Sequence, residues 1–156
     1  MFAIVIFIYL SVNIKTQVFL SFLKSKSEFN LEGASILIND NCYAPSVHCS
    51  YYSVLQLIKH KYVRLKEISY SVLSQNTIAD KRNSHKYLID EFCVHLQSNT
   101  KKKLSLYEIR NLKRDIEDLK QFRIDSDYDN IEINYDKSTK ALNLSKSILK
   151  RIKNIR

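Results

Sequence analysis

The chain has 156 residues and a formal net charge of +9, from 25 Lys and Arg against 16 Asp and Glu. This length suits one domain with a sizeable core, and the positive charge favours a partner that carries phosphate or acidic groups. One Gly and one Pro are too few for the tight turns of a β-sandwich or β-barrel, so the composition indicates long helices.

The first residues form an apolar segment. Residues 1–12 are almost wholly apolar, and Lys15 is the first charge. We expect no signal peptide, because no basic leader precedes the run and no small-residue cleavage site follows it. A membrane partner is also not expected, since a span of about 20 residues would have to include Lys15 and its polar neighbours. We take residues 1–16 as an extension that is natural and buried, membrane-associated, or the product of an upstream start codon, and residues 17–156 as the folded domain.

Cysteines and histidines indicate a reduced protein without a metal. Cys42, Cys49 and Cys93 cannot form an even set of disulfides, so we expect free thiols and a cytoplasmic protein. His85 and His95 lie ten residues apart, nearly three helical turns, and cannot share one ion. There is also no glycine-rich phosphate loop. We expect no metal and no cofactor.

Two helices are predicted in the first half of the chain. The first runs from about Val18 to Asn39, and its inward candidates are Phe22, Phe29, Gly33, Ile36 and Leu37. A polar break at residues 39–41 predicts a short connection. The second runs from about Pro45 to Tyr62 and carries two neighbouring stripes, one of Val47, Tyr51, Val54, Ile58 and Tyr62 and one of His48, Tyr52 and Leu55. Two stripes are typical of the central helix of a bundle.

The middle of the chain is mixed. A short helix is expected after residue 63, and residues 75–77 and 81–83 are predicted to be loops. Ser84 is the expected N-cap of a third long helix, on which His85, Leu88, Phe92 and His95 share one face.

The longest predicted helix runs from about Leu104 to Tyr128 and ends in polar residues. Its apolar seam consists of Ile109, Leu112, Ile116 and Leu119, and the next position on that seam is Arg123. An arginine is costly to bury unpaired, so it should lie at a polar cleft or beside a carboxylate such as Asp127. Either Arg123 pairs locally at the end of a bundle, or it marks a functional cleft with Asp127 and Tyr128.

The last predicted helix is capped by Asn134 or Asp136 and has an apolar and a basic side. Ala141, Ile148, Ile152 and Ile155 face inward, whereas Lys137, Lys140, Lys146, Lys150, Arg151, Lys153 and Arg156 form the outer side. That side is either a solvated surface or an RNA-binding one. The predicted fold is therefore all-α, an antiparallel helical bundle.

Several motifs resemble those of HEPN-domain proteins. The run Cys42–Tyr52 resembles a HEPN helix in which small residues lead into paired tyrosines, and His85 at the start of the next long helix is also similar. Arg123–Tyr128 resembles the Arg-x-x-x-Asp-Tyr motif of one HEPN branch. The resemblance covers about residues 20–155.

The resemblance implies an antiparallel bundle of four to five helices that forms a homodimer, in which the two arginine-bearing helix ends meet in a cleft. Many HEPN proteins are metal-independent ribonucleases of toxin–antitoxin or antiphage systems, and they use an arginine followed by a histidine. Here Tyr128 occupies the position of that histidine, and no histidine follows His95. The catalytic candidates are Arg123, Asp127 and Tyr128, and the candidates for lining an RNA or nucleotide cleft are His48, Tyr51, Tyr52 and His85.

Three functional hypotheses follow. The first is an RNA-associated HEPN protein that cleaves RNA. The second is a non-catalytic module that binds nucleotide or RNA, or docks a small nucleotidyltransferase that modifies a tyrosine such as Tyr128. The third is a structural bundle anchored by its apolar N-terminus.

Overall fold

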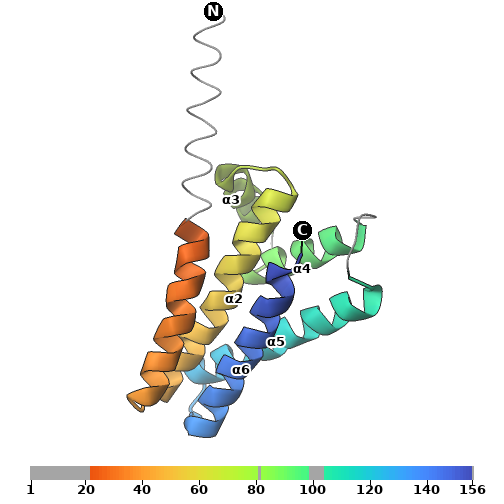
Figure 1. The fold of residues 1–156 in the computed structure, drawn as a ribbon. Coiled ribbons are helices and arrows are strands. Elements are labelled where there is room, and N and C mark those ends of the chain that lie inside the picture. Colours follow the sequence, from red (N-terminus) through yellow and green to blue (C-terminus); the bar gives the residue numbers. More distant parts are fainter. Residues whose placement is uncertain (1–21, 81, 99–103, 156) are drawn as a thin grey trace, which may run out of the picture.

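The computed structural model describes residues 22–80, 82–98 and 104–155. Within these ranges the chain forms six helices and no strand, which confirms the all-α prediction (Figure 1). A helix over residues 22–39 precedes α2 (Tyr43–Leu65), α3 (Tyr70–Ala79), α4 (Ser84–Ser98), α5 (Leu106–Tyr128) and α6 (Tyr135–Lys153). No helix in these ranges is both long and apolar enough to cross a membrane. The extension predicted at residues 1–16 lies outside the described residues.

Helix α2 is the centre of the bundle, as its two stripes predicted. It packs against α6, α5 and α4. Every member of its first stripe is buried, and Tyr51, Val54 and Ile58 are 0% exposed. Of the second stripe, Leu55 is buried, whereas His48 and Tyr52 are half-buried at the edge of the core.

The bundle is not antiparallel throughout, which corrects the expected arrangement. The first residues of α2 and α6 lie together, since the rings of Tyr43 and Tyr135 are 6.2 Å apart. Their last turns also lie together, because the Lys61 ammonium donates to the carbonyl of Ile155 over 2.6 Å. The two helices therefore run in the same direction (Figure 1). Helix α5 brings the chain back to the start of α2, so the helix that follows it must run parallel to α2.

The inward face predicted for the first helix was wrong. Phe22, Phe29 and Ile36 are 58%, 70% and 53% exposed. The buried residues of this helix are Leu23, Ser27, Ala34 and Ile38, one or two positions away along the helix.

Small side chains decided which face turned inward. Ser27 is buried and donates a hydrogen bond to the Ser53 carbonyl over 2.6 Å. Two bulky phenylalanines at this interface would keep the helix away from α2. Gly33 does not mark a close approach, because a Cβ placed there would meet nothing within 4 Å.

Polar residues begin and end the helices. Asn41 adopts φ 61° in the predicted connection, a left-handed conformation that asparagine tolerates at a helix end. Residues 75–77, predicted as a loop, lie inside α3. The cap of α4 is Asn83 in place of the predicted Ser84, since its Oδ1 accepts the N–H of His85 over 3.0 Å. Asn134 caps α6, one of the two predicted alternatives.

A capping box that sequence analysis overlooked begins α5. The Ser105 hydroxyl accepts the Glu108 backbone N–H over 3.2 Å, and the Glu108 carboxylate accepts the Ser105 N–H over 2.7 Å. The Ser-x-x-Glu spacing is itself a helix-start signal. It places the first residue of α5 at Leu106, two residues later than predicted.

Candidate functional site

Arg123 continues the buried seam of α5. The four apolar residues before it on this seam are 0% exposed, and its own side chain is 14% exposed. Its guanidinium is paired, as the cost of burying a lone charge requires. Arg123 Nε lies 2.7 Å from Asp127 Oδ2, and Arg123 Nη2 donates to the Tyr128 hydroxyl over 3.0 Å.

The pairing of Arg123 with Asp127 is an ion pair rather than an aligned hydrogen bond. The two charged groups are close, but the Nε–H does not point at the carboxylate, and buried Nε lacks a hydrogen-bond partner. Burial of Arg123 works to lower its pKa. The hydrogen bond to Tyr128 and the charge of Asp127 outweigh that effect, so its pKa is raised. The guanidinium is therefore a fixed positive charge beside a carboxylate.

Asp127 also contacts His48, which comes from α2. His48 Nδ1 lies 3.0 Å from Asp127 Oδ2, the same oxygen that pairs with Arg123. The His48 side chain is 44% exposed, and its Nε2 makes no hydrogen bond to a described residue. This contact joins α5 to a histidine that lies 79 residues earlier in the chain.

The end of α5 is docked on the start of α2. The Ser126 hydroxyl donates to the Ala44 carbonyl over 2.9 Å, between two elements 82 residues apart. Sequence analysis did not select Ser126, since a lone serine near a helix end carries no signal of its partner. This contact brings Asp127, the next residue, beside His48.

Two aromatic rings flank the Arg123 guanidinium. Its Cζ lies 4.8 Å from the centroid of the Tyr128 ring and 5.8 Å from that of the Tyr52 ring, within the range of cation–π attraction. The Tyr52 ring also lies 4.4 Å from the His48 ring, tilted by 31°. Tyr52 therefore fills the space between the histidine and the arginine.

Tyr51 and His85 lie next to Tyr52, on the side toward the core. The Tyr51 hydroxyl and His85 Nδ1 are hydrogen-bonded over 3.1 Å, and Tyr51 is 0% exposed. Burial raises the pKa of Tyr51 far above its ordinary value. The pKa of His85 is lowered, first by burial and then by the charges of Arg123, Lys120 and Lys59. Both groups are neutral near pH 7, which suits a positioning role.

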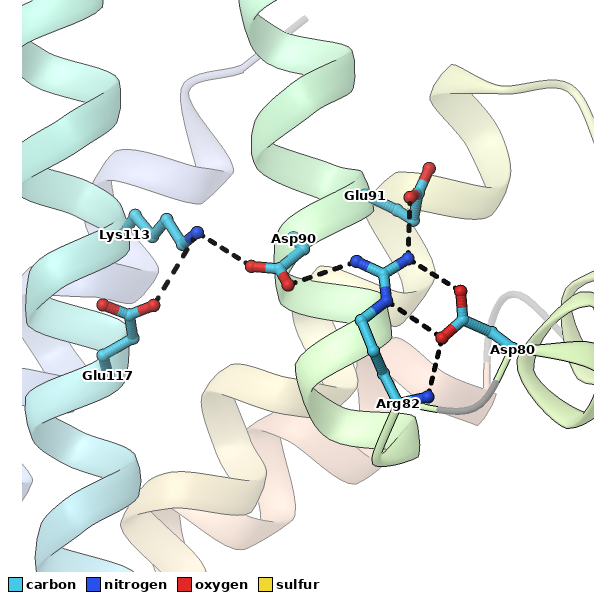
Figure 2. Close-up of polar contacts among 6 residues, drawn as sticks. All are labelled: Asp80, Arg82, Asp90, Glu91, Lys113 and Glu117. Carbon is cyan, nitrogen blue, oxygen red and sulfur yellow. Dashed lines mark hydrogen bonds and ion pairs between the residues drawn. The ribbon is translucent and has the colours of Figure 1, made fainter.

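An ionic network that sequence analysis missed holds α4 in place (Figure 2). Arg82, two residues before α4, donates to Asp80, Asp90 and Glu91 over 2.9–3.2 Å. The hydrogen bond from the Arg82 side chain, then that from its backbone N–H, lowers the pKa of Asp80. Asp90 also accepts Lys113 of α5 over 2.8 Å. The network joins the loop before α4 to α4 and α5, and His85 lies in the first turn of that helix.

A pocket of about 200 Å³ lies between α2, α3 and α4. Tyr52 and His85 form one side of it. The other lining residues are Leu55, Gln56, Lys59, Leu73, Thr77, Ser84 and Leu88. Its apolar lining includes three leucines, Leu55, Leu73 and Leu88.

All seven site residues selected from the sequence lie in one contiguous group, named here the arginine cluster. Its members are Arg123, Asp127, Tyr128, His48, Tyr52, Tyr51 and His85. In the described part of the chain no group of three or more His, Cys, Asp or Glu residues could hold a metal ion. No protein-family model, curated protein or solved structure matches this chain.

Proposed function

We propose that the protein is a HEPN-type, RNA-associated protein of a toxin–antitoxin or defence system, and that the arginine cluster cleaves RNA without a metal. The observation that carries the proposal is the single carboxylate of Asp127 held between Arg123 and His48. It joins the permanent positive charge of a guanidinium to an imidazole. Homodimerisation, with the two clusters facing one cleft, belongs to the same proposal.

Each group has a role in a transesterification. His48 Nε2, the ring nitrogen that does not face Asp127, takes the proton of the ribose 2′-hydroxyl, whose oxygen attacks the adjacent phosphorus. Asp127 accepts the Nδ1–H of His48 and stabilises the imidazolium that forms. Arg123 stabilises the negative charge of the phosphorane. The Tyr128 hydroxyl, hydrogen-bonded to Arg123, protonates the 5′-oxygen that leaves, so the products carry a 2′,3′-cyclic phosphate and a 5′-hydroxyl.

The positive charge of Arg123 compensates for the negative charge that Asp127 brings to a phosphate-binding site. A lone Asp127 would repel a phosphate, but Arg123 at 2.7 Å offsets its charge. The pocket beside Tyr52 and His85 offers space for a base next to the scissile phosphate.

A second candidate is the non-catalytic module, and the exposure of Tyr128 favours it. This side chain is 70% exposed at the end of α5, where a nucleotidyltransferase partner could reach its hydroxyl. In that case Arg123, already engaged with Asp127 and Tyr128, holds the acceptor in place.

The test compares cleavage by wild type, Arg123→Ala and His48→Gln. Growth and total RNA are followed in an expressing host, and purified protein is assayed with EDTA for 2′,3′-cyclic phosphate ends. Loss of a general base or of transition-state stabilisation predicts a decrease of about 10²-fold or more in each variant. Arg110→Ala, an exposed arginine on the same helix, and His95→Gln are the matched controls and should retain activity.

The alternative outcomes are distinct. Intact RNA and normal growth with wild type would refute cleavage and favour the binding or docking module. Cleavage that survives His48→Gln but not Arg123→Ala would remove His48 from the chemistry.

A further inference from the structure

A second pocket lies at the C-terminal end of α2, away from the arginine cluster. It has a volume of about 350 Å³ and is formed by the helix over residues 22–39, α2 and α6. Its lining residues are Lys24, Glu28, Leu57, His60, Lys61, Arg64 and Lys153. Buried Leu57 and His60 form its floor, and the charged residues form its walls.

The walls of this pocket are strongly positive. Three lysines and one arginine face one carboxylate, a formal charge of +3 when His60 is left out of the count. Among the described residues that carboxylate, Glu28, pairs with Lys24 alone, at 3.9 Å, and both side chains are more than half exposed. Such a pair is weak, so it leaves most of the positive potential in place.

The helix ends favour several of these cations, since Arg64 lies in the last turn of α2 and Lys153 in the last turn of α6. Lysine and arginine are favourable at helix C-termini, and the Lys61 ammonium donates to the carbonyls of Ile155 and Lys153 over 2.6 and 3.3 Å. Two of its three donors are then used, and one remains. The side chains of Arg64 and Lys153 make no hydrogen bond or ion pair with any described residue. Their donors are available at the mouth of the pocket.

The cations act on one another across the pocket. The pKa of Lys61 is lowered, first by burial and then by the charges of Arg64 and Lys24. Like charges that lower a neighbour's pKa also raise the free energy of the empty site, and an anion between them relieves that repulsion.

We propose that this pocket binds phosphate groups, either those of a free nucleoside polyphosphate or consecutive phosphates of an RNA strand. Arginine offers a planar fork that matches phosphate oxygens, and lysine offers a point charge. A formal charge of +3 in about 350 Å³ suits more than one phosphate group. This site shares no residue with the arginine cluster and is independent of RNA cleavage.

The first measurement uses the full chain and inorganic tripolyphosphate. Binding is followed by titration calorimetry at an ionic strength held constant with NaCl. The pocket variant combines Arg64→Gln with Lys153→Gln, two exposed residues whose replacement leaves the core intact. The control variant combines Lys146→Gln with Lys150→Gln, which removes the same charge from exposed positions on α6 outside the pocket.

We expect Kd to rise about tenfold or more in the pocket variant and less than about twofold in the control. Competition then identifies the source of the phosphates. Displacement of tripolyphosphate by a single-stranded RNA oligonucleotide assigns the site to an RNA backbone, and displacement by ATP alone assigns it to a free nucleotide. Absence of binding by wild type, or equal weakening in both variants, would overturn the proposal.

Discussion

The hydrogen bond between Tyr51 and His85 links the core of α2 to the first turn of α4, and its energy can be predicted from the structure. Tyr51→Phe removes the hydroxyl and keeps the ring, which is 0% exposed, so the core stays filled. A hydrogen bond between neutral groups contributes about 0.5–1.5 kcal/mol net. We expect Tyr51→Phe to lower the free energy of unfolding by about 1 kcal/mol.

A double-mutant cycle separates this bond from other effects. Tyr51→Phe, His85→Ala and the double variant are unfolded with urea at pH 7.5, where a histidine with a lowered pKa is neutral. If the two groups interact as described, the double variant should be less destabilised than the sum of the single variants by about 1 kcal/mol. Tyr52→Phe is the matched control, because the Tyr52 hydroxyl makes no hydrogen bond to a described residue. Its effect should stay within about 0.5 kcal/mol.

Additivity would refute this reasoning. If the effects of Tyr51→Phe and His85→Ala sum to within about 0.3 kcal/mol, the two groups are not coupled. His85 would then lie apart from Tyr51 in solution, and the inner part of the arginine cluster would not be assembled.

Two further predictions concern the start of α5 and acid stability. Ser105→Ala removes the capping box and should lower the free energy of unfolding by about 0.5–2 kcal/mol. The control, Ser147→Ala on the exposed side of α6, should leave it unchanged. Thermal unfolding followed by circular dichroism compares the two variants. The pKa values of His85 and His95 are both lowered in the folded protein, first by burial. The unfolded chain therefore binds more protons as the pH falls through about 6.5, and stability must decrease with it. Urea unfolding at pH 7.5 and 5.5 should show a smaller loss in a His85→Gln/His95→Gln variant than in wild type, and an equal loss would contradict the assignment.

Local patterns were sufficient for most of the helices. The seam of α5 and the stripes of α2 repeat at the helical period, so the sequence predicted both helices, their buried faces and the place of Arg123. The same reasoning failed for the first helix, because periodicity does not distinguish a stripe of phenylalanines from a neighbouring stripe of small residues. Only packing against α2 decides, since Ser27 and Ala34 allow a closer approach than Phe29 does.

The packing of the helices brings the residues of the arginine cluster together. The period of α5 and the cost of burying an unpaired arginine marked Arg123 and Asp127 as candidates, and the family resemblance added His48. No local pattern places His48 beside a carboxylate 79 residues later. That contact requires the end of α5 to dock on the start of α2, and the docking depends on how all the helices bury their apolar faces together. The sequence by itself therefore determined the helices and the chemical groups, and the packing of the bundle determined which groups meet.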